Sequence, residues 1–234
     1  MFTTSHFIWI FLIAAVVAIM LIWGNDRLTL RSASYIMAGI CFVSETSKMM
    51  SWMIDSPFGG KILSPKALPF HLCSLMLFGV MYITFGKNQA KKQRVMDFLA
   101  VAGTLGSICA ILIPTEGSSF TNIRSYQCFV YHGGLLWFAT YLIASGNAHL
   151  GWKSWRRNLG FMFGLLIAMT YVNSFLSAYG TNFMFIVRPP MEGLPYLNLN
   201  KGWCVYFLRL TILGFTLVTL FQLPFIIKEH KHKQ

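Results

Sequence analysis

Seven apolar stretches, each about as long as a membrane-spanning helix, take up most of the 234 residues. A helix needs about 20 mostly apolar residues to cross the hydrocarbon core of a bilayer. The stretches are approximately 7–23, 33–53, 68–86, 95–113, 126–145, 158–178 and 204–226. Charged residues make up only 11% of the chain, against roughly 25% in soluble domains. The pattern predicts an all-α polytopic membrane protein, a seven-transmembrane-helix bundle that forms a single domain over residues 1–234.

The basic residues alternate from one connection to the next and predict the orientation of the helices. With the N-terminus outside, the cytoplasmic segments hold Arg27, Arg31, Lys87, Lys91, Lys92, Arg94, Lys153, Arg156, Arg157, Lys228, Lys231 and Lys233. The outside loops hold Lys61, Lys66, Arg124, Arg188 and Lys201. Cytoplasmic loops of membrane proteins carry an excess of Lys and Arg. We therefore expect an outside N-terminus, a cytoplasmic C-terminus and a multi-pass location in the cell membrane. This distribution explains the formal net charge of +12 without a nucleic-acid partner.

Cysteine usage argues against a metal site. The five cysteines show no C-x-x-C spacing, and all lie in or at the edge of apolar stretches. Cysteine in such surroundings behaves as a small hydrophobic residue. An odd number placed in this way is not typical of a disulfide framework or of zinc binding. We expect neither a metal nor a cofactor.

Ionisable residues at membrane depth are expensive, so each is a candidate functional residue. Glu45 and Lys48 are three residues apart in stretch 33–53 and share one helical face. They are interpreted either as a structural ion pair or, for Glu45, as a ligand of substrate. His132 lies about 9 Å below the expected start of the helix over 126–145, since each residue rises 1.5 Å. It either bonds to a neighbouring helix or takes part in the chemistry.

The segment Leu68-Pro69-Phe70-His71-Leu72-Cys73 opens the third stretch. A proline suits the first turn of a helix, which would put His71 and Cys73 in that turn or at the start of the next. The positive end of the helix dipole favours a thiolate and disfavours an imidazolium. Nucleophilic acyl chemistry needs such a thiol and a neutral imidazole. Residues two apart on a helix point about 200° apart, so a direct His71–Cys73 pair requires a distorted first turn.

These polar residues are expected to share one depth. His71, His132, Glu45 and Asn173 all fall in the outer half of their helices, and the inner half shows little that is comparable. Scattered polar contacts between helices would not segregate in this way. The sequence therefore predicts a polar cavity that opens toward the outer leaflet, with Asn182 and Arg188 from the following outside loop as further substrate-binding residues.

A family resemblance adds a chemical hypothesis. The segment from Leu68 to Cys73, the pair His132-Gly133 and the stretch Gly180-Thr181-Asn182-Phe183-Met184 followed by Pro189 together resemble the YwaF-like family of small bacterial integral membrane proteins. The family looks like seven-span proteins, and its eukaryotic relatives include a membrane acyltransferase that acts on phospholipids through a cysteine. The resemblance implies that Cys73 is an acyl acceptor and that His71 or His132 is its base.

Two functions remain open from the sequence. The first is an enzyme that transfers or hydrolyses acyl groups on membrane phospholipid, with Cys73 as nucleophile, a histidine as base, and Asn173 or Asn182 as oxyanion donor. The second is a non-catalytic carrier or substrate-binding subunit for a small polar solute, which would use Glu45 and the histidines. A retinal protein is excluded, because the last stretch, 204–226, contains no lysine.

Overall fold

The computed structural model describes residues 2–231 and has an α-helix at each of the seven predicted spans. The helices are α1 (Thr4–Gly24), α2 (Leu30–Ser51), α3 (Leu72–Phe85), α4 (Gln89–Leu112), α5 (Ile123–Ala144), α6 (Trp152–Phe175) and α7 (Trp203–Lys231). The connections contain a hairpin of β1 (Met53–Asp55) and β2 (Lys61–Leu63), and the 3-10 helices η1 (Pro65–Ala67), η2 (Ser177–Tyr179) and η3 (Phe183–Phe185). The prediction of an all-α protein with seven helices is confirmed, whereas the hairpin was not predicted.

Helix α3 begins later than its sequence pattern predicted. The expected start was Leu68, but the helix starts at Leu72 and has 14 residues. The proline ring of Pro69 disfavours helical backbone at the residue before it, and Leu68 is accordingly extended, with φ −56° and ψ 146°. His71 is the N-cap residue and is also extended. His71 therefore lies outside the helix, and the 200° relation to Cys73 does not apply.

Four of the seven helices are long and apolar enough to cross a membrane: α1, α4, α6 and α7. Helix α3 is shorter, since 14 residues rise about 21 Å against a hydrocarbon thickness of about 30 Å. Helices α2 and α5 are long but contain more polar residues, among them Glu45, Lys48 and His132. The three helices that miss this apolar criterion carry Glu45, Cys73 and His132.

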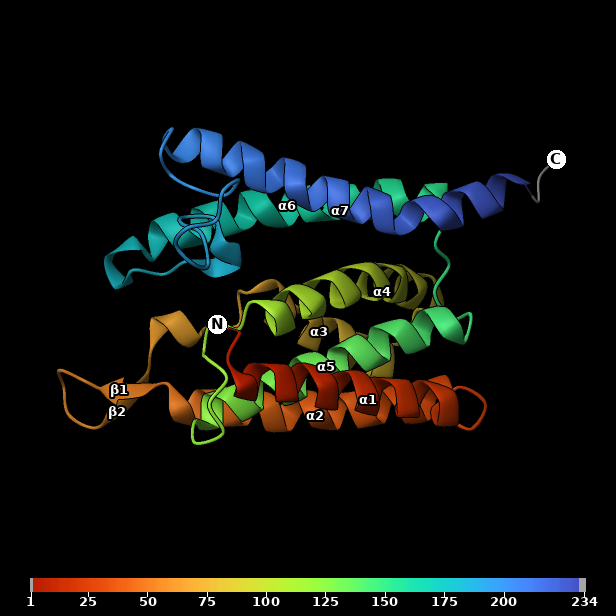
Figure 1. Ribbon diagram of the computed structural model, residues 1–234, viewed down its shortest axis with the longest axis horizontal. Coiled ribbons are helices and arrows are strands. Elements are labelled where there is room, and N and C mark those ends of the chain that lie inside the picture. Colours follow the sequence, from red (N-terminus) through yellow and green to blue (C-terminus); the bar gives the residue numbers. More distant parts are fainter. Residues whose placement is uncertain (1, 232–234) are drawn as a thin grey trace.

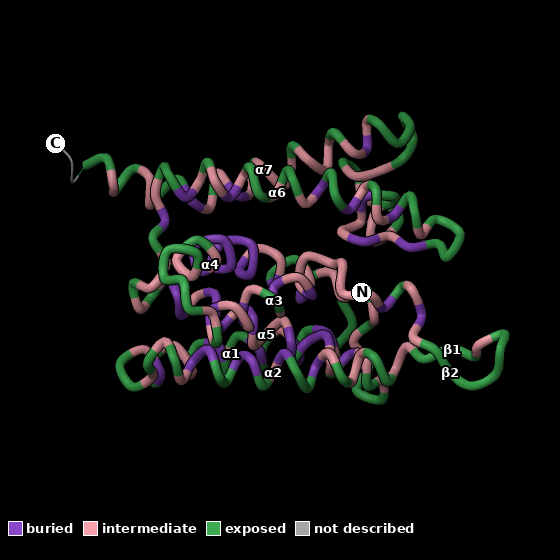
Figure 2. The backbone as a smooth tube through the Cα atoms, turned by 180° about the vertical axis from the view of Figure 1, so that it is seen from behind, coloured by how far each residue is buried: buried purple, intermediate pink, exposed green. Residues whose placement is uncertain are grey.

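The helices pack as a five-helix bundle with a two-helix layer on one side. Helix α5 packs against α1, α2 and α4, helix α3 packs against α2 and α4, and α6 pairs with α7. Figure 1 shows the α6–α7 pair as a separate layer beside α4. The buried residues concentrate in the middle of the five-helix bundle, mostly on α4 and α5 (Figure 2). Large apolar side chains remain exposed on α1 and α7, as expected for surfaces that face lipid.

The alternation of the helices gives the molecule two different ends. One end, here called the hairpin end, contains β1, β2 and the long connection 176–202 (Figure 1). The opposite end, here called the basic end, contains the connections 25–29, 86–88 and 145–151 and the end of α7. The basic residues that the sequence assigned to the cytoplasm lie at the basic end, except Lys233, which is outside the described residues.

Candidate functional site

An ion pair connects α2 to the start of α3 in the hairpin half of the bundle. Lys48 Nζ lies 2.5 Å from Glu45 Oε1 and also donates a hydrogen bond to Ser74 Oγ at 3.1 Å. Both charged side chains are about 14% exposed. The pair forms on one helical face, as its spacing predicted, and it reaches the first turn of α3.

The first turn of α3 presents Cys73 with free backbone donors around it. The Tyr131 hydroxyl of α5 donates to the Cys73 carbonyl oxygen at 2.5 Å. The Cys73 sulfur faces α4, where a Cβ added to Gly106 would lie 3.9 Å from it. Leu75 is the first residue whose N–H bonds back into the helix start, to the His71 carbonyl. The N–H groups of the residues before Leu75 have no partner within the helix, so they can donate hydrogen bonds to an oxygen that carries negative charge.

His132 is held in one tautomer by its own helix. Its Nδ1 lies 2.6 Å from the Cys128 carbonyl oxygen. Because a carbonyl oxygen only accepts, Nδ1 carries the proton and Nε2 holds the lone pair. Within residues 2–231, Nε2 makes no hydrogen bond. His132 is therefore oriented as a proton acceptor whose accepting nitrogen is unused.

His71 lies beneath the connection that follows α6. Its ring centroid lies 5.4 Å from those of both Phe183 and Phe185. Lys48 and His132 also lie within electrostatic range of its ring. The structure thus brings His71, His132, Glu45 and Lys48 into one region, from three separate segments.

The thiols in this region are not arranged as a preformed pair with a histidine. Among the described residues, the Cys73 thiol makes no hydrogen bond to His71 or His132. The thiol in contact with an imidazole is that of Cys128, at 3.6 Å from His132 Nδ1. Sequence reasoning missed Cys128, although its spacing of four residues from His132 places both on one helical face.

The other predicted substrate-binding residues support the connection 176–202. Asn173 accepts from the Phe183 N–H at 2.7 Å and donates to the Phe183 carbonyl oxygen at 3.0 Å. Asn182 donates to the Arg188 carbonyl oxygen and accepts from the Val187 and Arg188 N–H groups. Both amides are engaged by backbone, so neither is available as an oxyanion donor in this conformation. Arg188 lies exposed on the same connection.

An open cavity of about 400 Å³ adjoins this region at the hairpin end. It is lined by residues of the hairpin, of the segment before α3 and of α5, with Lys66 and Arg124 among them. Arg124 donates to the Ser51 carbonyl oxygen at 2.7 Å and stacks on Trp52. The cavity therefore combines two cations with aromatic and apolar walls.

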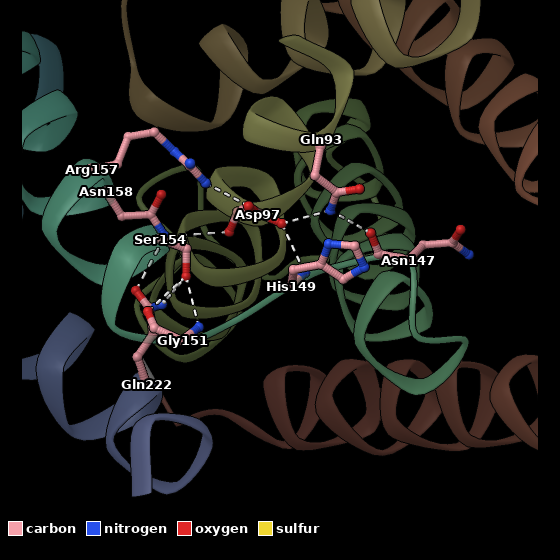
Figure 3. A network of polar contacts seen from close by, with 9 residues as sticks. All are labelled: Gln93, Asp97, Asn147, His149, Gly151, Ser154, Arg157, Asn158 and Gln222. Atoms are coloured by element: carbon pink, nitrogen blue, oxygen red, sulfur yellow. Dashed lines mark hydrogen bonds and ion pairs between the residues drawn. The ribbon is translucent and has the colours of Figure 1, made fainter. Parts of the chain in front are cut away.

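A second buried polar cluster lies at the basic end, where the sequence analysis expected little. Asp97 of α4 is 3% exposed and is bonded to Arg157 of α6 at 2.5 Å. It also accepts from Gln93 and from the His149 N–H, each at 2.8 Å. Figure 3 shows how Asn158 continues the cluster to Gln222 of α7. The expectation that the inner half holds little that is comparable was wrong. Asp97 is an acidic residue inside the stretch 95–113, which was the available signal.

No group of three or more His, Cys, Asp or Glu side chains that could hold a metal ion occurs within residues 2–231.

Seven helices, four of them long apolar candidate spans, and polar groups gathered inside the bundle define a multi-pass membrane protein. Residues 1–222 match the TMEM164 family, and the chain belongs to that family. This match corrects the resemblance to the YwaF-like family: the correction rests on nearly the whole chain, whereas the resemblance rested on short segments. No curated protein and no solved structure matches the chain.

Proposed function

We propose that this protein transfers or hydrolyses acyl groups on membrane phospholipid, with Cys73 as the nucleophile and His132 as the base. The observation that carries the proposal is the anchored imidazole of His132. Its Nδ1–H is bound to a carbonyl oxygen while Nε2 is unused, and Tyr131, the residue before it, bonds to the backbone of Cys73. Hydrogen bonds between catalytic groups often form only when substrate is bound, so the unpaired thiol is compatible with this role.

The reaction proceeds in two balanced steps. The Cys73 sulfur attacks the ester carbonyl carbon while His132 Nε2 takes the thiol proton. The C–O bond of the ester then breaks, and the leaving alkoxide takes that proton from His132 to become the hydroxyl of a lysophospholipid. A second hydroxyl, from another lipid or from water, attacks the thioester and restores the thiol. The acceptor decides between transfer and hydrolysis.

The first turn of α3 supplies the stabilisation that the amides of Asn173 and Asn182 do not. Its unpaired backbone N–H groups surround Cys73, and the helix dipole is positive at this end. A preorganised donor to the developing oxyanion contributes roughly 3–4 kcal/mol in other acyl-transfer enzymes. The chain thus carries nucleophile and oxyanion donors on one short helix.

The cavity at the hairpin end supports a phospholipid as the substrate. Ser51, which lines it, is one helical turn beyond Lys48, about 4.5 Å along α2. Lys66 can neutralise a phosphate, as can Arg124 when a phosphate replaces Glu116, whose carboxylate lies 3.6 Å from the guanidinium. The apolar walls suit the glycerol and the acyl ester. A headgroup bound here would present its ester toward α3.

The proposal includes seven membrane spans, an outside N-terminus and a location in the cell membrane. Helices α2, α3 and α5 would cross the membrane with other helices covering their polar side chains, since α5 packs against α1, α2 and α4. Irregular backbone before α3 is tolerated at membrane depth where protein covers it, and the connection 176–202 lies over His71.

The decisive experiment follows acyl transfer from a labelled phospholipid to lysophospholipid in mixed micelles, with intact-mass detection of a protein thioester. Cys73→Ala is expected to abolish both turnover and thioester, and His132→Ala to lower turnover at least a hundredfold. His71→Ala is expected to reduce turnover less than His132→Ala, and Cys204→Ser to leave it unchanged. A thioester that persists in Cys73→Ala and disappears in Cys128→Ala would overturn the assignment of the nucleophile.

The second candidate is a carrier or substrate-binding subunit for a small polar solute. The observation that favours it is the set of four ionisable side chains, Glu45, Lys48, His71 and His132, that gather around the start of α3. Full acyl turnover without Cys73, or no turnover by the unmodified protein on any phospholipid, would favour this reading. Solute binding that depends on Glu45 and His132 would then test it directly.

A further inference from the structure

A nearly apolar groove lies between α3, α4 and α6, and runs from Leu75 near the start of α3 to Arg94 and Arg157 at the basic end. Its volume is about 420 Å³. Its walls include Phe78 and Tyr82 of α3, Phe98 of α4, and Phe161 and Leu165 of α6. The rings of Phe98 and Phe161 meet edge to face with centroids 4.6 Å apart, and close one side. The groove therefore runs along the junction of the α6–α7 layer and the five-helix bundle.

Two arginines stand at one end of the groove. Arg94 of α4 is exposed, and among the described residues it makes no ion pair or hydrogen bond. Arg157 of α6 binds Asp97 through one terminal nitrogen, whereas its buried Nε has no partner. Neighbouring Lys91, Lys92 and Arg156 add positive charge at the same end. This end of the groove is therefore strongly basic and has unused donors.

We propose that the groove binds one anionic membrane phospholipid from the leaflet at the basic end. One acyl chain lies between α3, α4 and α6, and the phosphate lies against Arg94 and Arg157. This proposal does not rest on the acyl-transfer function, because none of the residues assigned to that chemistry lines the groove.

The acyl chain and the headgroup of the bound lipid contribute to binding in different ways. An acyl chain moving from bilayer to groove stays in apolar surroundings, so hydrophobicity gives little preference for the site. The groove selects by shape, and the arginines select by charge. A basic residue at the surface of an anionic membrane is worth about 1 kcal/mol, which corresponds to about a fivefold change in affinity.

Because the groove lies between the two layers of the molecule, a lipid bound in it would affect how the layers hold together. Direct bonds between the two layers at this end run through Asp97, Arg157 and Asn158. A chain in the groove fills the space beside these bonds and extends the contact of α6 with α3 and α4. The lipid would thus secure the α6–α7 layer to the bundle.

The test is a titration of the detergent-purified protein with phosphatidylglycerol or phosphatidylcholine of identical chains, followed by native mass spectrometry. Phosphatidylglycerol is expected to bind at lower concentration. Arg94→Gln should weaken its binding about fivefold, while the matched control Lys91→Gln, on the same helix but outside the groove, should change it less than twofold. Arg157 is left intact because its removal would expose the charge of Asp97.

A second variant tests the apolar part. Leu165→Trp fills the groove and should weaken binding of both lipids, whereas Leu208→Trp on the exposed face of α7 should not. Equal losses in Arg94→Gln and Lys91→Gln would overturn the proposal, since charge attraction would then be unspecific. Equal binding of the two lipids, or normal binding in a folded Leu165→Trp protein, would also overturn it. If thermal unfolding shows that Leu165→Trp does not fold, the two charge variants still decide.

Discussion

Tyr131 and Tyr141 lie on the same helix and make the same kind of bond at opposite ends of the molecule. Tyr131 donates to the Cys73 carbonyl oxygen at 2.5 Å in the hairpin half, and Tyr141 donates to the Leu28 carbonyl oxygen at 2.7 Å at the basic end. Both residues are at least 95% buried. Comparing the two tyrosines therefore distinguishes a hydrogen bond that only stabilises the fold from one that also positions the nucleophile.

Tyr131→Phe and Tyr141→Phe should each lower the free energy of unfolding by about 0.5–1.5 kcal/mol, because each removes one hydrogen bond to a partly buried carbonyl oxygen. Only Tyr131→Phe should also reduce acyl turnover, by about tenfold or more, since displacement of a catalytic group by about 1 Å has effects of this order. Thermal unfolding and turnover should be measured on the same preparations. Equal turnover in the two variants would show that the bond to Cys73 does not position it.

The ion pair of α2 can be tested by a double-mutant cycle. Glu45→Gln or Lys48→Met alone should reduce folded yield and lower stability by about 3 kcal/mol, because each leaves a poorly solvated charge unpaired. The double variant should be less destabilised than the worse single variant. Asp55 and Lys61 on the exposed hairpin, 3.8 Å apart, are the control, and their cycle should show no measurable coupling. A double variant no better than the worse single variant would contradict coupling in α2.

Contacts between side chains could be predicted where both partners lie on one helix. The Glu45–Lys48 pair follows from a spacing of three. His132 lies deeper than predicted, about 13.5 Å from the helix start, because α5 begins at Ile123 and not at position 126. The partners of Cys73, His71 and Asn173 were not predictable, because each depends on how separate segments meet. Asn173 illustrates the limit: the sequence showed a polar group at the outer end of α6, but its bonds to Phe183 depend on a turn of irregular backbone.

At the scale of elements, the connection 176–202 is a structured cover over His71. Met184 and Phe185 both have φ near 54°, a strained conformation for residues with side chains. Asn173, the Trp203 indole and the Tyr206 hydroxyl bond to its backbone. These bonds from α6 and α7 hold the rings of Phe183 and Phe185 against the imidazole. The α6–α7 layer thus reaches the candidate site through this connection.

Asn173→Ala should release this cover. The variant leaves the buried Phe183 N–H unpaired and removes one of the two hydrogen bonds to the Phe183 carbonyl oxygen, which keeps the bond from the Ile186 N–H. The expected cost is about 2–3 kcal/mol. Hydrogen exchange of residues 182–187 should become faster by about two orders of magnitude, because 2.7 kcal/mol corresponds to a hundredfold change in an opening equilibrium. Asn198→Ala, in the exposed part of the same connection, should leave exchange at 182–187 unchanged. Unchanged exchange in Asn173→Ala would contradict the anchoring role.

At the scale of the whole molecule, the most informative features of the sequence were the distribution of basic residues and the length of the apolar stretches. They predicted seven helices and the end at which the basic residues gather. They did not predict the division into a bundle and a two-helix layer, because α6 and α7, like α1, are long and apolar enough to span a membrane. That division depends on Asp97, Arg157 and Gln222, which come from three helices far apart in the sequence. Helix boundaries were least predictable where proline precedes the helix, as at α3.

The predicted orientation can be measured with probe cysteines. In a variant whose native cysteines are replaced, Lys91→Cys at the basic end should resist an impermeant thiol reagent in intact cells, and Ser56→Cys in the hairpin should react. The excess of basic residues at one end is the physical reason. After permeabilisation both probes should react, which controls for burial. Labelling of position 91 in intact cells would reverse the orientation.

The buried core residues are concentrated in the part of the chain that is synthesised first. Every fully buried apolar residue of the main core lies in α1 to α5, except Leu150 and Val218. When translation reaches the connection after α5, the interior of the bundle can already close, before α6 and α7 exist. Because N-terminal parts of a chain can fold as they emerge, α6 and α7 then pack against a bundle of α1 to α5 that is already folded. They join it through the Asp97 cluster and the cover over His71, so the candidate site is completed last.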